Sequence, residues 1–431
     1  MLPSFLALPP EQLTLLRIVA DEASARGLPV YIVGGFVRDL LMGQPSLDLD
    51  IVVVGDAVAL ARALARKHGG KVTAHARFGT ASWKTDDGRR TTDRELPPAI
   101  DLITSRRETY PQPAALPDVT PSTLEDDLRR RDFTINTLAL RLDGGHFGEL
   151  VDLYHGADDI ARGIIRVLHP ASFLDDPTRM FRAVRYEQRY GFAIAPETLA
   201  LIPAALPQVA ALSAERLRHE LDLIFDEPRA AHMLARLAEL GLLKAIENAL
   251  PWGDDLRERL DSGLAVSPGP EWDLTLRYAG VPFLPAGTSR QVLGYCLWLL
   301  DLSPSEIEAA QTRLVFPLTV LKAVRAAARL RVDLNALSGA RPSKWVERLG
   351  GVPLAAIYTV YLTSGEKALE AYASHWQHVH PKTDGDALKA LGVPPGPAYK
   401  KILLRLRAAW LDGEVASAEQ EKNLLEKLLV T

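Results

Sequence analysis

The stretch from Val30 to Val54 constrains the fold of this chain more than any other part of the sequence. An apolar run at 30–33 is followed by Gly34 and Gly35, then by a helical pattern over 36–42 and a second apolar run at 49–54. Two glycines allow a sharp backbone turn and a close approach to a ligand. The free amide groups at the start of the helix, with Arg38 in its first turn, favour a phosphate-binding site. The stretch therefore predicts a strand, a turn, a helix and a second strand.

The second strand carries two acids that predict a metal site. Side chains alternate between the faces of a strand, so Asp48 and Asp50 share one face while Leu49 and Ile51 pack on the other. Paired carboxylates beside a phosphate site are what Mg²⁺-dependent phosphoryl or nucleotidyl transfer requires. Each pattern alone is typical of an ordinary turn or a solvated strand face. Together, in the context of strand, turn and helix, they favour a nucleotide and metal site.

A third acid, Asp101, lies in the strand predicted at 99–103 and would complete a catalytic metal site. The alternative is a strand-end carboxylate bonded to a neighbouring loop. The proline-rich stretch 108–127 that follows is long for a connection and lacks an obvious secondary structure, so it is either a functional lid or a passive surface loop.

The arrangement of helical and strand patterns predicts an α/β domain followed by helical domains. A length of 431 residues suggests two to four domains. Up to about residue 168 the two patterns alternate, which predicts a small domain with a mixed sheet. After Pro170 the pattern is almost purely helical, and residues 249–288, rich in Gly, Pro and Trp, indicate a boundary. The expected strands are 29–33, 49–54, 71–75, 80–84, 99–103, 133–141 and 148–153, and the expected helices are 11–26, 58–68, 174–190, 196–203, 213–225, 229–239, 289–300 and 317–331, with a helical module from about 383 to the end.

Composition excludes some classes of protein. Cys296 is the only cysteine, which rules out an intrachain disulfide and a zinc site built from cysteines. The N-terminus has no basic region before an apolar core, and no apolar run approaches the ~20 residues of a membrane span. We therefore expect a soluble cytoplasmic protein. The formal net charge of −4 means that an RNA partner must bind through local basic patches.

Two further segments carry residues suited to nucleotides. Arg131 is expected to bind triphosphate oxygens, because a guanidinium binds them through two donors, and Asp132 and Asn136 are placed to contact ribose hydroxyls. In the predicted helix 174–190, Asp176 and Arg179 offer the acceptor and donors that could read the edge of a base, and Arg182 and Arg185 lie on the same side. The alternatives are a solvated basic strand start and an exposed salt bridge.

Basic residues farther along the chain predict an RNA-binding surface. Lys322, Arg325 and Arg329 lie along one face of a predicted helix, and Lys400 and Lys401 add charge in the last module. A plain solvated face is the alternative.

These motifs together resemble the class II tRNA nucleotidyltransferases and bacterial poly(A) polymerases. The matching stretches are GGFVRDLLMG with DLDIVV, RRDFTINTLAL from Arg130, DLYHGADDIARGIIRVLHP from Asp152, DDPTRMFRAVRYEQRYGF from Asp175, and DGDALKALGVPPGPAYKKIL from Asp384. The resemblance covers about 28–240 and 383–415. It implies a head with the mixed sheet of polymerase-beta-like nucleotidyltransferases, followed by all-α parts. The implied division is a catalytic head at 1–168, a base-recognising neck at 169–245, and a body at 246–380 and a tail at 381–431 that both contact tRNA.

The resemblance also implies roles for individual residues. Gly35 and Arg38 would hold the triphosphate, Asp48 and Asp50 two Mg²⁺ ions, and Arg131 the nucleotide. The neck residues matching those that recognise ATP and CTP are Asp176, Arg179, Arg182 and Arg185. Asp175 stands where the family usually has a glutamate, so its hydrogen bond to the base-reading arginine would be weaker or differently aimed.

The implied activity is template-independent addition of AMP, and of CMP in some members, to the 3′ end of tRNA with release of pyrophosphate. Members add CCA, only CC or only the terminal A. The stretch 107–127 has the full length found in family members that add the terminal A, and its amino-acid sequence resembles theirs. Both features favour A addition. The alternatives are a complete CCA-adding enzyme, then a CC-adding enzyme or a poly(A) polymerase and, in another class, a non-catalytic RNA-binding protein.

Overall fold

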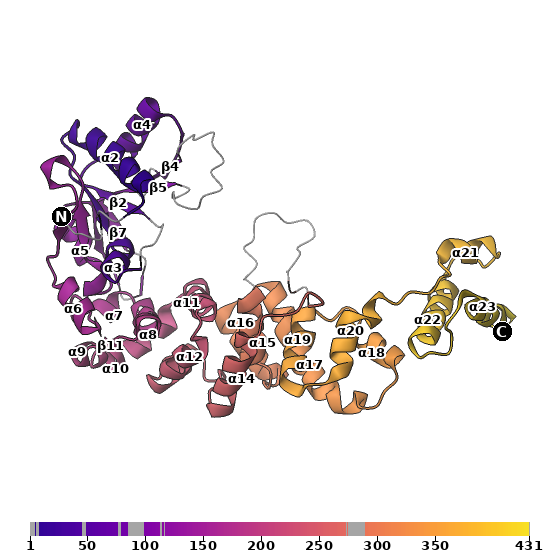
Figure 1. Ribbon diagram of the computed structural model, residues 1–431. Coiled ribbons are helices and arrows are strands. Elements are labelled where there is room, and N and C mark those ends of the chain that lie inside the picture. Colours follow the sequence, from indigo (N-terminus) through magenta and orange to yellow (C-terminus); the bar gives the residue numbers. More distant parts are fainter. Residues whose placement is uncertain are drawn as a thin grey trace. The chain divides into compact units, whose positions relative to one another are not determined.

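The chain forms two compact units, which we describe separately. The computed structural model describes residues 5, 8–44, 49–75, 79–84, 99–112, 114–115, 117–272, 274 and 289–430. The first unit comprises 1–213 and 240–245, and the second comprises 214–239 and 246–431 (Figure 1). The finer division into four parts stays a prediction.

A mixed seven-stranded sheet is the centre of the first unit. Its strand order is β3-β4-β5-β2-β1-β8-β9, and β2 and β5 run parallel while the other neighbouring pairs are antiparallel. The predicted mixed sheet is therefore confirmed. The strands are β1 (Val30–Val33), β2 (Asp50–Val53), β3 (Lys71–His75), β4 (Thr80–Lys84), β5 (Ile100–Thr104), β8 (Ala139–Arg141) and β9 (Glu149–Val151).

Helices cover both faces of this sheet, because its central strands are apolar on both sides. Val30 and Ile32 of β1 join a large core with α2 and α4, whereas Tyr31 and Val33 join a smaller core on the other face with Leu128 of α5. The alternation follows the twofold periodicity of a strand. Figure 1 shows α2 beside α4. The helices are α2 (Pro10–Ser24), α3 (Gly35–Leu41), α4 (Ala57–His68), α5 (Leu124–Arg129) and α6 (Gly156–Arg162).

The predicted strand 133–141 is wrong in its first half. Only Ala139–Arg141 is a strand, Thr134–Asn136 forms a 3₁₀ turn, and Phe133 makes a single bridge to Val167. Side chains here bond locally: the Thr137 hydroxyl donates to the Thr134 carbonyl at 2.7 Å, and the Asn136 amide donates to Asp132 at 2.9 Å. Such bonds compete with strand pairing.

The predicted helix 174–190 is broken in two. Helix α7 (Ser172–Asp175) ends before Pro177, and α8 (Thr178–Tyr190) begins after it. Asp176 between them is extended, with φ −136° and ψ 95°, because a residue before proline is disfavoured in the helical region. Asp175 and Asp176 therefore do not share a helix with Arg179, Arg182 and Arg185, as the sequence analysis assumed.

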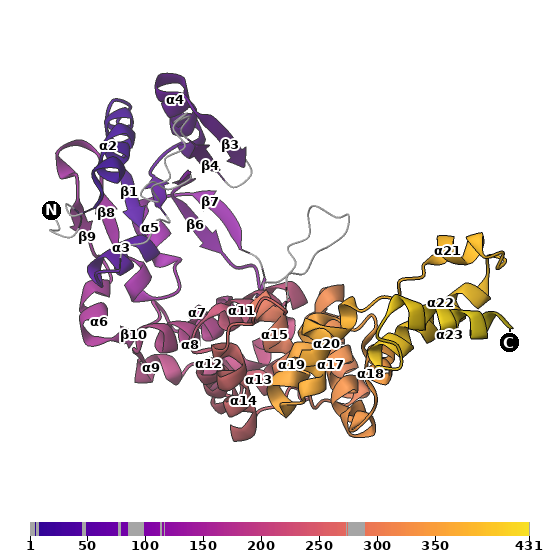
Figure 2. The ribbon, with the colours of Figure 1, turned by 45° about the vertical axis from the view of Figure 1, so that its right-hand side comes forward.

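The stretch 108–127 has regular structure, contrary to expectation. Strands β6 (Arg106–Thr109) and β7 (Asp118–Pro121) pair antiparallel from Arg106 opposite Pro121 to Thr109 opposite Asp118, and α5 follows them (Figure 2). We call β6, β7 and the residues between them the hairpin.

The remaining elements of the first unit are β10 (Ile164–Ile165), β11 (Ala193–Ile194), α9 (Pro196–Leu199), α10 (Ile202–Ala205), and the 3₁₀ segments Gly144–His146 and Leu206–Ala211.

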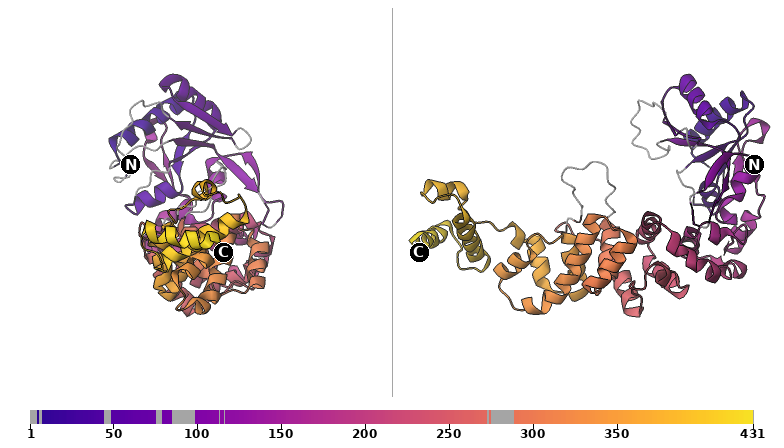
Figure 3. Two further views of the ribbon diagram at one scale, coloured as in Figure 1. Left: turned by 90° about the vertical axis from the view of Figure 1, so that its right-hand side faces the viewer. Right: turned by 180° about the vertical axis from the view of Figure 1, so that it is seen from behind.

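The second unit contains no strand among its described residues (Figure 3). One of its helices, α14, lies within the stretch 249–288 that was expected to be a boundary. In the part of the chain that the structure describes, no helix is long and apolar enough to cross a membrane. The helices are α11 (Ala214–Asp226), α12 (Ala230–Glu239), α14 (Asp254–Ala265), α15 (Ser289–Trp298), α16 (Pro304–Leu314), α17 (Leu318–Leu337), α18 (Pro342–Leu349), α19 (Leu354–Ser364), α20 (Lys367–Ser374), α21 (Gly385–Ala390), α22 (Pro397–Leu411) and α23 (Ala418–Val430), with a 3₁₀ segment at Trp376–His378; α13 (Leu242–Ile246) spans the division between the units.

Candidate functional site

A polar pocket of about 660 Å³ lies within the first unit, where α3, β2, β5, β6 and α8 meet. Six of the residues that line it are arginines and five are acids. A cluster of six guanidinium groups suits a polyanionic ligand such as a triphosphate, because arginine pairs with its oxygens through two donors. The predicted site residues in its lining are Gly35, Arg38, Asp50, Arg131, Asp132, Asn136, Asp176, Arg179 and Arg182.

Three predicted residues do not line this pocket, and Asp48 lies outside the described residues. Gly34 shapes the turn beside it: its φ is +74°, and a Cβ there would lie 2.6 Å from Nη1 of Arg131. Side chains larger than hydrogen would therefore displace that arginine. Arg185 is only 8% exposed, and its guanidinium lies 5.3 Å from the centre of the Tyr186 ring.

The third residue, Asp101, is exposed on β5 but stands next to Asp50 in the parallel pair. Paired residues of neighbouring strands point to the same face of a sheet, so the two carboxylates share a face. That face is the one with Val52 and α5, since Ile51 and Leu102 belong to the core on the opposite face. Asp101 thus has the position expected of an additional acid beside the pocket.

A buried carboxylate, Asp127 of α5, orders two of the pocket arginines. Its Oδ1 accepts from Nε and Nη2 of Arg130 at 3.0 and 2.8 Å, and its Oδ2 accepts from Nη2 of Arg131 at 3.1 Å. Burial alone would raise the pKa of Asp127, but the charges and hydrogen bonds of the two arginines outweigh it and hold that pKa below its usual value. Asp127 is therefore ionised at neutral pH and fixes both guanidinium groups.

A second buried acid, Asp132, links α8 through Asn136 to Arg38 of α3. Its Oδ2 lies 2.8 Å from Nη2 of Arg182, and its Oδ1 accepts from the Asn136 amide at 2.9 Å. Burial would raise the pKa of Asp132, but the Arg182 charge and the Asn136 hydrogen bond lower it below its usual value. The side-chain oxygen Oδ1 of Asn136 in turn accepts from Nη1 of Arg38 at 2.6 Å. Asp132 and Asn136, predicted as ribose contacts, thus also hold arginines.

Arg38, predicted to hold triphosphate, is almost buried, with 5% exposure. Its Nε and Nη2 donate to Asp39 at 2.8 and 3.0 Å, and its guanidinium lies 5.3 and 4.9 Å from the rings of Tyr186 and Tyr190 on α8. Aromatic faces attract a guanidinium in this geometry. Arg38 therefore joins α3 to α8 as well as lining the pocket.

The predicted base-reading pair, Asp176 and Arg179, sits at the break between α7 and α8. The Asp176 carboxylate accepts from the Thr178 backbone amide at 3.0 Å and from the Thr178 hydroxyl at 2.6 Å, which fixes it against the first residue of α8. Arg179 donates to the Ser172 hydroxyl at 2.7 Å and to the Arg130 carbonyl at 2.8 Å. Both side chains line the pocket and are held in place by neighbours.

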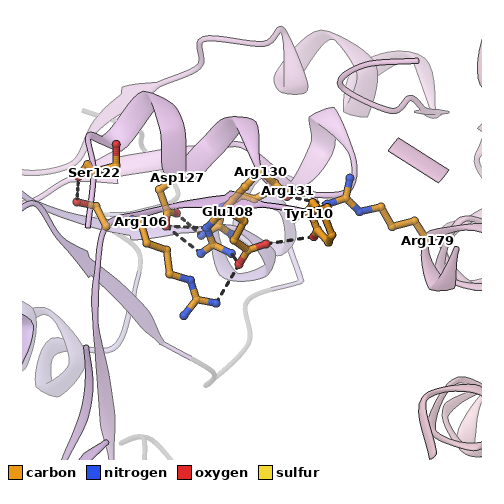
Figure 4. A network of polar contacts seen from close by, with 9 residues as sticks. Arg106, Glu108, Tyr110, Ser122, Asp127, Arg130, Arg131 and Arg179 are labelled. Atoms are coloured by element: carbon orange, nitrogen blue, oxygen red, sulfur yellow. Dashed lines mark hydrogen bonds and ion pairs between the residues drawn. The ribbon is translucent and has the colours of Figure 1, made fainter. Parts of the chain in front are cut away.

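The hairpin supplies pocket residues that the sequence analysis missed, as Figure 4 shows. Glu108 accepts from Nη2 of Arg106 at 3.1 Å and from Nη1 of Arg130 at 2.9 Å, and the Tyr110 hydroxyl donates to it at 3.2 Å. Burial raises the pKa of Tyr110 to about 12, so its phenol is neutral at physiological pH. Other missed residues are Asp39, Asp127, Arg130, Tyr186 and Arg189. For Asp127, the spacing of three and four residues to Arg130 and Arg131 on a helix was an available signal.

The basic residues predicted to contact RNA lie in the second unit and are exposed. Lys322, Arg325 and Arg329 occupy one face of α17, and Lys400 and Lys401 lie on α22. Arg325 pairs with Glu308, and Arg329 lies 3.9 Å from Asp333. The exposure of these basic side chains is consistent with a surface that binds a large anion. Their role in binding RNA stays a prediction.

Comparison with known proteins decides the family. Residues 30–166 match the model of the poly A polymerase head domain, and residues 191–250 match that of the probable RNA- and SrmB-binding site of polymerase A. The chain is 31% identical to the A-adding tRNA nucleotidyltransferase of Halalkalibacterium halodurans, over 95% of this chain and 91% of the relative. It belongs to the tRNA nucleotidyltransferase family.

Other relatives within this family add different nucleotides. The chain is 33% identical to the CC-adding tRNA nucleotidyltransferase of Deinococcus radiodurans, over 96% of this chain and 94% of the relative. It is 35% identical to the A-adding tRNA nucleotidyltransferase of Geobacter sulfurreducens over 98% of this chain, but it spans only 47% of that relative's length. The resemblance found in the sequence is confirmed.

A solved structure of a CCA-adding enzyme in complex with ATP is similar to the whole fold. It has a TM-score of 0.79 and 28% sequence identity, and the match covers 98% of this chain and 96% of that one. The predicted fold class, a mixed-sheet head followed by helical parts, is confirmed.

Proposed function

We propose that this protein is a tRNA nucleotidyltransferase that adds AMP to the 3′ end of tRNA without a template and releases pyrophosphate. The observation that carries the proposal is the pocket of the first unit, which combines Asp50 with six arginines in a chain of this family. The names of its relatives support tRNA as the acceptor, and the similar ATP complex supports a nucleoside triphosphate as the donor.

In this proposal, some pocket residues bind the triphosphate of the nucleotide and others bind its base. Arg131, with Arg38 and Gly35, is assigned to the triphosphate, and Arg130, ordered by the same carboxylate as Arg131, is added to this side. Asp176 and Arg179 are assigned to the base edge, with Arg182 beside them. Because buried acids hold these arginines, little side-chain freedom is lost when the ligand binds.

The reaction joins two substrates at one phosphorus atom. The 3′ hydroxyl of tRNA attacks the α-phosphorus of ATP, a new P–O bond forms, the bond between the α-phosphorus and the oxygen bridging to the β-phosphate breaks, and the hydroxyl proton passes to water. Pyrophosphate leaves with the negative charge that builds up on its oxygens. The pocket arginines are placed to balance this charge and to hold ATP in line with the hydroxyl.

Magnesium is part of the proposal. Asp50, its neighbour Asp101, and Asp48 offer carboxylate oxygens, the ligand type that Mg²⁺ prefers. Among the described residues, no group of three His, Cys, Asp or Glu side chains is gathered closely enough to hold a metal, so the site would rely on Asp48 and on the triphosphate for further oxygens. When bound, Mg²⁺ lowers the pKa of the attacking hydroxyl and neutralises the leaving group.

We further propose that 1–168 is the catalytic head, 169–245 the neck that reads the base, and 246–380 and 381–431 the parts that contact tRNA. Lys322, Arg325, Arg329, Lys400 and Lys401 are assigned to tRNA phosphates, where exposed cations gain from counterion release.

The identity of the added nucleotide is tested by supplying defined acceptor ends. Purified protein is incubated with tRNA ending before CCA, after C, or after CC, together with each labelled nucleoside triphosphate. We expect efficient AMP addition to tRNA ending in CC, with weak or absent CMP addition to the shorter ends. Addition of two cytidines with no AMP at saturating ATP would overturn the A-adding assignment in favour of CC addition, which the Deinococcus relative also supports. Addition of all three nucleotides would make it a CCA-adding enzyme.

A further inference from the structure

Two tyrosines of α8 cover the guanidinium of Arg38. The rings of Tyr186 and Tyr190 stack with their centres 5.8 Å apart and their planes inclined by 30°. The guanidinium carbon of Arg38 lies 5.3 Å from the centre of the first ring and 4.9 Å from that of the second. An aromatic ring attracts a guanidinium at this distance, and more strongly where water is excluded. Because Arg38 is 5% and Tyr186 7% exposed, water is largely excluded from this contact.

Hydrogen bonds fix the edge of the same guanidinium. Nε and Nη2 of Arg38 donate to the Asp39 carboxylate, and Nη1 donates to the side-chain oxygen of Asn136. A guanidinium has five N–H donors, so the bonds to described residues leave one N–H of Nη1 and one of Nη2 for a ligand. Nη2 lies beside the glycine turn, since a Cβ at Gly35 would be 3.4 Å from it. Arg38 thus offers the pocket two donors of fixed orientation.

The two tyrosines belong to a longer row of aromatic rings. The fully buried Phe133 meets Tyr186 edge-on with ring centres 5.8 Å apart, and Phe192 packs on Tyr190 at 5.6 Å. Among the described residues, the rings that face the Arg38 guanidinium are those of the two tyrosines. Burial raises the pKa of the Tyr190 phenol, so Tyr190 is neutral at physiological pH and attracts the cation through its ring. Phe133 and Phe192 therefore support the row from its two ends.

We propose that Tyr186 and Tyr190 are positioning residues for the triphosphate, because they hold the guanidinium of Arg38 so that its two remaining donors serve the ligand. The inference rests on the proposed function and extends the triphosphate side of the site to the end of α8. Every nucleoside triphosphate carries the same triphosphate, so the pair affects how tightly any nucleotide binds and leaves the choice of base to other residues, such as Arg179 near the start of α8. Neither ring needs to touch the reacting phosphorus.

The test compares Tyr190→Leu with Tyr190→Phe and with Phe192→Leu. Tyr190→Leu removes the aromatic face over Arg38, Tyr190→Phe keeps the face and removes only the hydroxyl, and Phe192→Leu shortens the same row one ring farther from the arginine. For each purified variant, kcat and KM are measured for ATP and for GTP with tRNA ending in CC. The KM for tRNA, the inhibition constant of pyrophosphate and the thermal unfolding midpoint are measured as well.

We expect Tyr190→Leu to raise the KM for ATP and the inhibition constant of pyrophosphate by about fivefold each, the effect of losing one largely desolvated cation–π contact. Its kcat, its KM for tRNA and its ratio of kcat/KM for ATP over GTP should change less than about twofold. Tyr190→Phe and Phe192→Leu should match the parent. A purely structural role would instead lower the unfolding midpoint and kcat, act in Phe192→Leu as well, and leave the inhibition constant of pyrophosphate unchanged.

A double-mutant cycle shows whether Tyr190 acts through Arg38. Adding Tyr190→Leu to Arg38→Ala should raise the KM for ATP no further, because the ring has lost the cation that it holds. An equal rise in both backgrounds would overturn the inference, and so would parental constants in Tyr190→Leu. If Tyr190→Leu does not fold, Tyr190→Met takes its place, because it fills the space with a flexible side chain that has no aromatic face.

The parent enzyme separates this inference from the proposed function. If the parent adds no nucleotide to any tRNA end, the proposed function fails and the inference fails with it. An active parent whose affinity for ATP and pyrophosphate is unaltered by Tyr190→Leu refutes only the role of the tyrosines.

Discussion

The cations of the pocket and those of the second unit are held in different ways. In the pocket, Arg130 and Arg131 share the fully buried carboxylate of Asp127, and Arg182 pairs with Asp132, which is 5% exposed. On α17, by contrast, Arg325 and Arg329 are exposed and their acidic neighbours Glu308 and Asp333 are at least one-third exposed.

Under the proposed function, the difference corresponds to two kinds of anion recognition in one chain. Buried acids fix the pocket arginines in advance, so the pocket can distinguish ligands by geometry and loses little entropy on binding. Exposed cations keep their freedom, and their pairs are worth about 0–1 kcal/mol. They attract a polyanion through its charge, and salt weakens that attraction. The predictions below separate these two behaviours.

The largest effect is expected from the acids of the predicted metal site. Asp50→Ala, or Asp48→Ala, should reduce nucleotide incorporation roughly a thousandfold or more, because metal-assisted charge stabilisation is worth several kcal/mol. Stability should change little, since strand-face acids contribute little to folding. Incorporation by each variant is measured with tRNA ending in CC, and Asp118→Ala on the exposed side of β7 is the control. Parental activity in both variants would refute their catalytic role.

The next effect concerns the buried acid that orders two arginines. Asp127→Asn should lower the free energy of unfolding by about 3 kcal/mol at pH 7, because it removes the buried negative charge that Arg130 and Arg131 share. The folded-state pKa of Asp127 is depressed, so the stability it contributes is present above its unfolded-state pKa and is lost as the pH falls through the lower folded-state value.

The measurement for Asp127→Asn is denaturant unfolding at several pH values. The difference in the free energy of unfolding between parent and variant should be largest at neutral pH. It should become smaller below about pH 4, the ordinary pKa of an aspartate. A constant gap from pH 7 to pH 3 would show that the charge of Asp127 is not what stabilises the unit.

A smaller effect is expected from the residues assigned to the base. Arg179→Ala and Asp176→Ala should each reduce discrimination between ATP and other nucleotides by about 1–3 kcal/mol, the value of one bidentate base contact. Competition between labelled ATP and unlabelled GTP or UTP measures this directly. If both variants still exclude GTP and UTP as strongly as the parent, the base is read elsewhere.

The smallest effect is expected from a single exposed cation. Lys322→Gln on α17 should raise the KM for tRNA about twofold and reduce the slope of log KM against log salt by about 0.7–0.9, the contribution of one phosphate contact. The KM for ATP should stay unchanged and serves as the internal control. An unchanged salt slope would remove Lys322 from the RNA-binding surface.

The sequence predicts much of the first unit because its signals are local. The alternation of helical and strand patterns up to about residue 168 predicted the mixed sheet, and the glycine turn at Gly34 and Gly35 identified one wall of the pocket. The break at Asp176 was missed although Pro177 signals it, because the regular spacing of the arginines suggested one continuous helix. The 3₁₀ turn at Thr134–Asn136 was missed because side-chain bonds replaced strand pairing there.

The remaining site residues could not be read from local patterns. Glu108 meets Arg130 across 22 residues of sequence, and Arg179 meets the Arg130 carbonyl across 49. Such contacts depend on how the hairpin and α8 pack, which composition and periodicity do not specify. The roles of Lys322 and Lys400 stay predictions for a related reason: exposure alone does not identify a ligand.

The central claim is that the pocket of the first unit binds the nucleotide, and photo-crosslinking with labelled 8-azido-ATP tests it most directly. The protein is irradiated with the probe, digested, and the labelled peptides are identified, with and without excess ATP. The account predicts labelling in the segments 106–131 and 172–190, abolished by excess ATP and strongly reduced in Arg179→Ala. Labelling confined to the second unit, or labelling of the first unit that excess ATP does not prevent, would contradict the account.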